Sequence, residues 1–196
     1  EETRLFNGKD LSGWAFFLDK SGPNADGSMK MEDVWTVESG RIRCSGVPNG
    51  YIRTVTDHRD FVLTLEWRWP ETPGNSGVLL RVVGPDKIWP RTVEAQLQSG
   101  NAGDFWLMDG ATLDTDPARV DPKAANHRLK RAAAEKPAGE WNLYEITMHG
   151  GRVLLKINGT VVNEGTGAAE VAGKIALQSE GAPIEFRNIR LTPVTD

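Results

Sequence analysis

The fold is decided by the stretch Phe61-Val62-Leu63-Thr64-Leu65-Glu66-Trp67-Arg68-Trp69. A large apolar side chain stands at every odd position, and the positions between carry Val62 or a polar residue. A period of two is typical of a β-strand with one buried face, because successive side chains of a strand point to opposite sides. The sequence therefore predicts a strand over 61–69 whose odd-numbered residues belong to the core.

The same alternation recurs along most of the chain. In 92–98, apolar side chains at 93, 95 and 97 alternate with Glu94, Gln96 and Gln98. Further short strands are expected at 35–37, 40–44, 51–55, 77–83, 141–148, 153–157, 174–178 and 184–191. Asn158-Gly159 predicts a hairpin, because a type I′ turn needs positive φ at both central residues. Many short strands with glycine-rich turns predict an all-β fold, an antiparallel β-sandwich or jelly roll.

One region interrupts this pattern. Residues 114–139 contain several aspartates, three prolines and a basic segment, which predict a long surface excursion with one helical turn at Ala132–Glu135. A loop of that length usually serves a binding site or is disordered. The chain has 196 residues and no internal repeat, so we expect a single domain over 1–196.

The composition excludes several classes of protein. Lys and Arg total 23 and Asp and Glu total 27, a net charge of -4 without a basic run, which argues against nucleic-acid binding. No stretch approaches the roughly 20 apolar residues of a transmembrane helix. Cys44 is the only cysteine, the three histidines lack metal-ligand spacing, and no cofactor is identified. The chain starts at Glu1 without a methionine or an apolar leader, as a mature exported protein would.

Strand alternation also places long polar side chains on faces that point away from the core. The side chains concerned are Glu66, Arg68, Arg81, Glu94, Gln96 and Gln98. Three strands side by side would bring them to one groove. The competing interpretation is a solvated sheet face with Glu–Arg pairs across strands.

The tryptophans favour a ligand-binding site over a solvated sheet face without a function. Trp67 and Trp69 belong to the predicted core, but Trp89 and Trp106 stand in loop-like segments beside the Glu94 strand. An exposed indole offers a flat apolar face and one donor, which suits stacking on a sugar ring, although a loop tryptophan can also plug the rim of a sandwich. Carboxylates, amides, arginine and tryptophan together indicate a carbohydrate ligand.

Ordinary glycoside hydrolysis needs two carboxyl groups roughly 5 to 9.5 Å apart. Laminarinase-type sandwich enzymes place them on one strand as Glu-x-Asp-x-x-Glu. The comparable strand here reads Glu94-Ala95-Gln96-Leu97-Gln98, and an amide can act neither as an acid nor as a nucleophile. This mechanism is therefore disfavoured.

The motifs of the chain resemble those of the 3-keto-disaccharide hydrolase family. The opening signature is Leu5-Phe6-Asn7-Gly8-Lys9-Asp10-Leu11-Ser12-Gly13-Trp14. The other matching segments, in chain order, are 66–68, 74–77, 94–96, 136–142, 158–159, 173–178 and 186–189. The resemblance spans nearly the full chain. It implies a concanavalin A-like sandwich in an exported bacterial protein, periplasmic or secreted, that acts on oxidised sugars.

One segment departs from the family pattern. Members often carry Leu-Gln-x-His-Gly where this chain has Leu177-Gln178-Ser179-Glu180-Gly181, so Glu180 stands in the place of a histidine. The resemblance implies that a ketone at C3 acidifies the C2 hydrogen, which a carboxylate removes before the C1 substituent leaves and water adds.

The expected catalytic residues are Glu94 as base, Arg68 or Arg81 at the enolate oxygen, and Glu66 as orienting group or acid. A divalent cation could replace the arginine. The expected substrate-binding residues are Asn75, Trp89, Gln96, Gln98, Trp106, Gln178 and Glu180. Two other functions stay open, a lectin-like carbohydrate-binding module without catalysis and an ordinary glycoside hydrolase.

Overall fold

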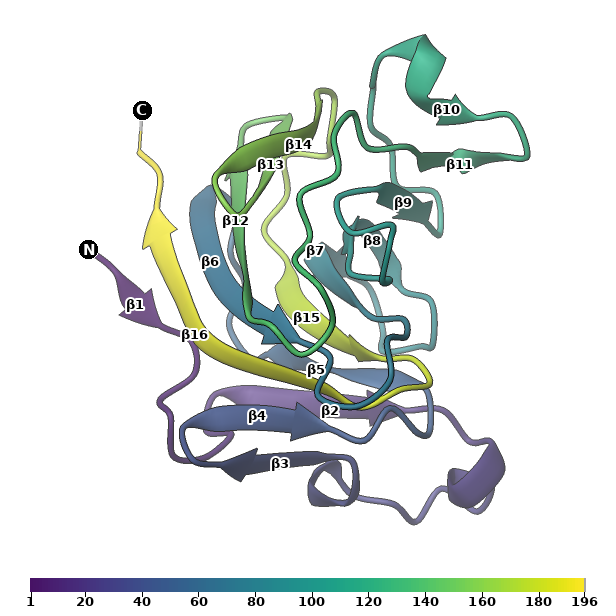
Figure 1. The fold of residues 1–196 in the computed structure, drawn as a ribbon, viewed down its shortest axis with the longest axis vertical. Coiled ribbons are helices and arrows are strands. Elements are labelled where there is room, and N and C mark those ends of the chain that lie inside the picture. Colours follow the sequence, from purple (N-terminus) through teal and green to yellow (C-terminus); the bar gives the residue numbers. More distant parts are fainter. Residues whose placement is uncertain (196) are drawn as a thin grey trace.

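The computed structural model describes residues 1–195 and consists of two antiparallel β-sheets that pack face to face (Figure 1). The first sheet has the order β14 (Thr160–Gly165), β13 (Arg152–Ile157), β12 (Asn142–His149), β6 (Phe61–Arg68), β16 (Ile184–Pro193), β4 (Arg41–Cys44) and β3 (Trp35–Glu38), with β1 (Thr3–Arg4) paired to β16. The second sheet has the order β10 (Val120–Asp121), β11 (Ala124–Arg128), β9 (Phe105–Met108), β8 (Arg91–Gln96), β7 (Gly77–Val83), β15 (Lys174–Ser179), β5 (Gly50–Thr54) and β2 (Trp14–Leu18).

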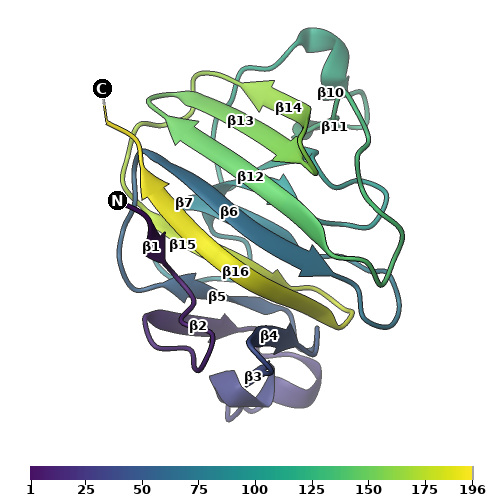
Figure 2. The same ribbon diagram turned by 60° about the vertical axis from the view of Figure 1, so that its left-hand side comes forward.

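Helical structure is limited to short 3₁₀ turns, which are η1 (Gly22–Asn24), η2 (Met31–Asp33) and η3 (Pro117–Arg119). None of the helices described for residues 1–195 is long and apolar enough to cross a membrane. Figure 2 shows the first sheet from its outer side, with strands of the second sheet behind it. The predicted antiparallel β-sandwich is confirmed.

The core lies between the sheets and follows the alternation in the sequence. Phe61, Leu63, Leu65 and Trp67 of β6 are fully buried, and the apolar residues at 93, 95 and 97 meet them from the second sheet. Full burial of an aliphatic or phenylalanine side chain contributes about 1.5–3 kcal/mol, so this interface accounts for much of the driving force for folding. The face of the second sheet that points away from this core is free to carry chemistry.

The hairpin between β13 and β14 has the predicted turn. Asn158 has a φ of 50° and Gly159 a φ of 83°, so both central residues are in the left-handed region that a type I′ turn requires. The side chain of Asn158 also donates to the carbonyl oxygen of Ala134 at 2.8 Å. The turn therefore anchors the C-terminal part of the 114–139 excursion through Ala134.

The excursion over 114–139 is built differently from the expectation. It contains η3 and the β10–β11 hairpin, and β11 pairs with β9 so that the second sheet becomes wider. The helical turn predicted at Ala132–Glu135 is wrong. Glu135 Oε1 accepts from the backbone N–H groups of Gly100 and Ala102, both at 3.0 Å, and these tertiary hydrogen bonds hold the segment in a non-helical path.

Candidate active site

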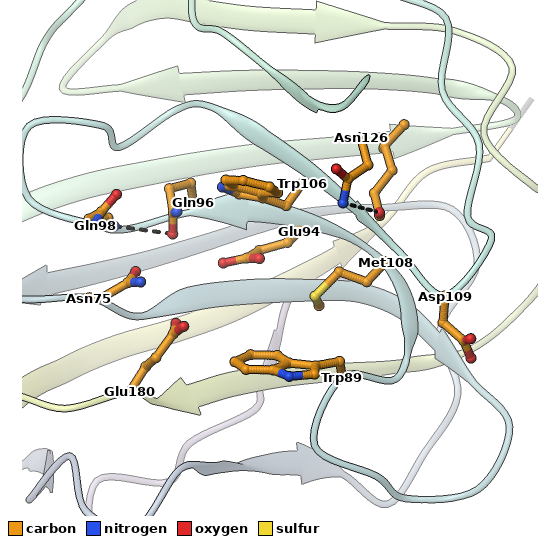
Figure 3. Close-up of a pocket in the computed structure, with 11 residues that line it drawn as sticks. Asn75, Trp89, Glu94, Gln96, Gln98, Trp106, Met108, Asp109, Asn126 and Glu180 are labelled. Carbon is orange, nitrogen blue, oxygen red and sulfur yellow. Dashed lines mark hydrogen bonds between the residues drawn. The ribbon is translucent and has the colours of Figure 1, made fainter. Parts of the chain in front are cut away.

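A pocket of about 440 Å³ opens on the outer face of the second sheet (Figure 3). It is lined by Asn75, Trp89, Glu94, Gln96, Gln98, Trp106, Leu107, Met108, Asp109, Asn126 and Glu180. Seven of these residues were expected from the sequence to act in catalysis or substrate binding. The lining residues as a whole come from the loop before β7, the β7–β8 loop, β8, β9 and β11, and from positions directly after β8, β9 and β15.

Strand register explains why these side chains meet. Leu79 is paired with Glu94, Glu94 with Trp106, and Trp106 with His127, so the four residues form one row across β7, β8, β9 and β11. Paired residues of neighbouring strands point to the same face of the sheet. Gln96 of β8 and Met108 of β9 follow two positions later and join the same face.

Gly77 leaves the room that the Glu94 carboxyl group occupies. It is paired with Gln96, and a Cβ atom at this position would lie only 2.1 Å from Glu94 Oε1 and 2.7 Å from Gln178 Oε1. No larger residue fits without displacing one of these groups. The missing side chain thus lets the carboxyl group of one strand lie over the backbone of the next.

Glu94 is held in an environment that favours its neutral form. The residue is 5% exposed, and within residues 1–195 its carboxyl group has no hydrogen-bond donor and no cation as a partner. Burial raises the pKa of Glu94 well above its usual value, and the nearby charge of Glu180 raises it further. Glu94 therefore keeps its proton at a pH where an ordinary glutamate is ionised.

Glu180 is the second carboxyl group of the pocket. The backbone of Asn75 bridges to Glu180 and Gly181, which places the end of β15 beside the loop before β7. Burial raises the pKa of Glu180 to about 7. Asn75 Oδ1 is buried and has no hydrogen-bond partner among the described residues, so this end of the pocket has polar capacity for a ligand.

Trp89 is carried by the 84–90 loop, which lies over the outer face of the sheet. Asp86 Oδ1 accepts from the Tyr51 hydroxyl and from Arg53 Nε, both at 2.8 Å. Lys87 Nζ lies 2.6 Å from Asp109 Oδ2 in the turn after β9. These contacts hold Trp89, which is 43% exposed, on the side of the pocket opposite Trp106 (Figure 3).

Trp106 is supported from the excursion. The imidazole ring of His127 stacks on it with ring centroids 4.1 Å apart and an interplanar angle of 4°. His127 Nε2 lies 2.7 Å from Asp104 Oδ2, and Nδ1 lies 2.9 Å from Asp121 Oδ2. With a carboxylate on each ring nitrogen, the imidazole cannot rotate, and it keeps the indole in one plane.

The expected positions of Glu66 and Arg68 in the groove are wrong. Both lie on β6, which belongs to the first sheet, so they face away from the core on the opposite side of the molecule. Arg68 Nε donates to Glu185 Oε1 at 3.0 Å, and Arg187 donates to Glu66 Oε1 at 3.0 Å. Alternation tells which residues point away from the core, but not which of the two sheets carries them.

The expected position of Arg81 is also wrong. The register of β7 against β8 changes between Leu80 and Val83, and Arg81 has a φ of 47°. This bulge turns the Arg81 side chain away from the pocket. Its guanidinium group donates to the carbonyl oxygens of Arg59, Gly150 and Ala169 at 2.7 to 2.8 Å and lies 3.2 Å from Asp60 Oδ1. Arg81 therefore joins loops at one end of the sandwich.

Gln178 was expected to line the pocket, but it lies beside the pocket and is not one of the lining residues. It is buried, and its Oε1 atom, which has no partner within residues 1–195, lies close to the Glu94 carboxyl group over Gly77. Sequence reasoning missed Leu107, Met108, Asp109 and Asn126. Met108 is signalled by its position two residues after Trp106, whereas no local pattern marks Asn126, which reaches the pocket through the pairing of β11 with β9.

The pocket combines the carboxyl groups of Glu94 and Glu180, which differ in burial, with the ion-paired carboxylate of Asp109, several amides and two indole walls. Of the described residues that line it, none is Arg or Lys. Across residues 1–195, no three His, Cys, Asp or Glu side chains group in a way that could hold a metal ion. One carboxyl group that stays neutral and another that titrates near pH 7 form a suitable pair for general acid–base chemistry.

Comparison with known proteins identifies the fold and the family. The chain superposes on a "putative glycosyl hydrolase" from Parabacteroides distasonis with a TM-score of 0.70 at 23% identity, covering 99% of this chain and 94% of that one. It is also similar to the carbohydrate binding module CBM66 from Bacillus subtilis (TM-score 0.63, 10% identity, 92% and 96% covered). A β-glucanase from Bacillus licheniformis gives a TM-score of 0.58 at 11% identity, with 98% and 97% covered.

At these identities the solved structures show a shared fold and nothing finer. No curated protein matches the sequence. The sequence profile of the 3-keto-alpha-glucoside-1,2-lyase-like domain matches residues 1–192 of the 196. The chain therefore belongs to the 3-keto-alpha-glucoside-1,2-lyase-like domain family.

Proposed function

We propose that the protein is an enzyme that cleaves 3-keto-glycosides, including 3-keto-disaccharides, by elimination and hydration in the pocket described above. The observation that carries the proposal is the pair Glu94 and Glu180, two carboxyl groups with raised pKa values between tryptophan walls. Family membership supports the same chemistry.

The environments of the two carboxyl groups suggest a different assignment from the one expected from the sequence. Glu94 was expected to be the base, but it is the more buried group and the nearby charge of Glu180 keeps it protonated. Glu180, with a pKa of about 7, is the carboxylate that can accept a proton at neutral pH. We therefore make Glu180 the base and Glu94 the acid.

The steps balance with these two groups alone. Glu180 takes the proton from C2, the C1–O bond breaks, and Glu94 gives its proton to the departing oxygen, which leaves a 1,2-unsaturated 3-keto sugar. Glu94, now ionised, removes a proton from water as the oxygen adds to C1. Glu180 returns its proton to C2, so both residues end in their starting forms.

Amide groups take the place of the arginine at the enolate oxygen. Gln96 Oε1 accepts from the backbone N–H groups of Leu97 and Gln98 at 3.1 and 3.3 Å, which orients the carboxamide and leaves its NH₂ group for a ligand. Asn75 offers a second carboxamide at the Glu180 end. Neutral donors can stabilise a developing oxyanion when they are fixed in place. A divalent cation in this role stays a prediction.

Ordinary glycoside hydrolysis is the second candidate, because the pocket does hold two carboxyl groups, which the strand sequence alone did not indicate. A lectin-like module would use the same tryptophans and amides without catalysis. The test incubates the protein with a 3-keto-disaccharide and, separately, with the unoxidised parent sugar. Release of 3-ketoglucose from the first alone supports the proposal, cleavage of the parent sugar supports the hydrolase, and binding without turnover supports the lectin.

A further inference from the structure

The pocket has two chemically different ends. Figure 3 shows Asn75, Gln98 and Glu180 at one end and Met108, Asn126 and Asp109 at the other, with Trp89 and Trp106 on opposite sides. A sugar ring carries hydroxyl groups around its whole edge and needs hydrogen-bond partners around it. An aromatic ring needs contacts mainly on its two faces.

The polar end has unused hydrogen-bonding capacity. Asn75 Oδ1 has no partner among the described residues, and the carboxyl groups of Glu94 and Glu180 receive no hydrogen bond within residues 1–195. Binding a hydroxylated ring here would satisfy these groups. The reacting sugar therefore fits at this end, against the two carboxyl groups.

Two polar groups of the other end already have protein partners. Asn126 Nδ2 donates to the carbonyl oxygen of Leu107 at 3.2 Å, and Asp109 is ion-paired with Lys87. Apart from Asn126 Oδ1, what remains for a ligand is the thioether of Met108 and the two indoles, and a thioether makes favourable contacts with aromatic rings. This end therefore offers more surface for stacking than groups for hydrogen bonds.

The Trp106 indole and the loop that carries Trp89 are also held in place. His127 covers one face of Trp106, and the 84–90 loop that carries Trp89 is tied to the sheet through Asp86 and to the turn after β9 through Lys87. The Trp106 side chain, which is fixed before binding, loses little entropy when a planar ring enters.

We propose that this apolar end, formed by Trp89, Trp106 and Met108, is the subsite for the leaving group and takes a planar aromatic aglycone. The inference rests on the proposed function and adds 3-keto-glycosides of phenols to its substrates. The step is the one given above: the C2–H bond breaks toward Glu180, the C1–O bond breaks, the phenolic oxygen takes the proton of Glu94, and water adds to the sugar.

Binding of unoxidised glucosides tests the subsite without turnover. Phenyl and cyclohexyl glucosides of the same anomer have aglycone rings of six carbons, of which only the phenyl ring is planar and aromatic, and isothermal titration calorimetry gives the Kd of each. We expect the phenyl glucoside to bind about three- to tenfold more tightly. Trp89→Ala should remove this preference and Trp89→Phe should keep it, while Phe16→Ala, at an exposed position of β2 outside the pocket, should leave it unchanged.

Equal affinity for the two glucosides, no binding of the phenyl glucoside, or a preference that survives both Trp89→Ala and Trp106→Ala would overturn the subsite. The proposed function fails separately, in the assay with a 3-keto-disaccharide. A protein that cleaves the disaccharide but does not distinguish phenyl from cyclohexyl keeps the function and loses the subsite. A protein that prefers the phenyl glucoside but releases no 3-ketoglucose from the 3-keto-disaccharide keeps the subsite and loses the proposed function.

Discussion

Glu94 and Glu180 show how residue environment assigns chemical roles. The same side chain is neutral at one position and titrates near pH 7 at the other, because one carboxyl group is more deeply buried and feels the charge of its neighbour. On this assignment kcat/KM should rise as Glu180 ionises at about pH 7 and fall at higher pH as Glu94 ionises. A rate that keeps rising toward alkaline pH would contradict the acid role of Glu94.

Leaving-group dependence separates the acid from the base. Glu94→Gln should slow cleavage of a 3-keto-disaccharide by about a hundred- to ten-thousandfold, because the departing oxygen loses its proton donor. An aryl 3-keto-glucoside with an acidic phenol, such as 4-nitrophenol, needs no such donor and should be cleaved at close to the wild-type rate. Glu180→Gln should slow both substrates, and initial rates of release of the leaving group, the second sugar or 4-nitrophenol, measure each case.

The reverse result, in which Glu94→Gln abolishes cleavage of both substrates and Glu180→Gln spares the aryl one, would return the role of base to Glu94. Far-UV circular dichroism of both variants provides the control for folding.

Gly77 allows a second prediction at the scale of the residue. Gly77→Ala would place a Cβ atom 2.1 Å from Glu94 Oε1, so the carboxyl group must move. We expect kcat/KM to fall at least about tenfold, because general acid catalysis depends on hydrogen-bond distance. In a Glu94→Gln background the same substitution should have little further effect on kcat/KM. Wild-type activity in Gly77→Ala would show that the position of the Glu94 carboxyl group is unimportant.

At the scale of elements, the β10–β11 hairpin turns the excursion into part of the site. It adds β11 to the edge of the second sheet, and through β11 it supplies Asn126 to the pocket and His127 to the back of Trp106. The bulge in β7 has the opposite effect, since it removes Arg81 from the same face. Pairing and bulges therefore decide which polar residues of the second sheet reach the pocket.

The contribution of the β10–β11 hairpin to substrate binding can be tested by removing the His127 ring that stacks on Trp106. His127→Ala should raise KM about three- to tenfold with a smaller change in kcat, because the indole loses the ring that keeps it in plane. His127→Phe keeps the stacking surface and should restore KM, although both variants leave Asp104, a buried carboxylate, with fewer partners and should lower Tm. If KM stays at the wild-type value in His127→Ala, the stack has no role in substrate binding.

At the scale of the whole molecule, the site costs stability at neutral pH. Both carboxyl groups bind their protons more tightly in the folded state, so the stabilising contribution of each is complete below the usual glutamate pKa of 4.5 and is lost as pH rises through its pKa in the folded state, which is about 7 for Glu180. In the wild type this should lower Tm by about a few degrees between pH 5 and pH 8.

The comparison with Glu180→Gln tests this effect, because the substitution removes the Glu180 carboxyl group and with it the charge that raises the pKa of Glu94. The variant should be more stable than the wild type at pH 8 and nearly equal to it at pH 5, as measured by urea unfolding at each pH. A difference that does not change with pH would mean that Glu180 titrates alike in the folded and unfolded chains.

The sequence by itself determined the sandwich and part of the site. Period-two alternation marks the buried residues of β6 and β8, and the Asn158-Gly159 turn follows from local conformational preference, because each of these signals depends on neighbours in the chain. The same alternation put Glu94, Gln96 and Gln98 on the outer face, where the structure has them. These features needed no knowledge of which strands pair.

Tertiary structure alone decided the rest. Alternation could not tell that β6 and β8 lie in different sheets, so Glu66 and Arg68 were assigned to a groove on the other side of the molecule. Neither the bulge at Arg81 nor the pairing of β11 with β9 follows from local sequence, since both arise from register between segments far apart in the chain. The raised pKa values of Glu94 and Glu180 also depend on tertiary structure, because the burial of both carboxyl groups and the effect of the Glu180 charge on Glu94 exist only when the folded strands form the pocket.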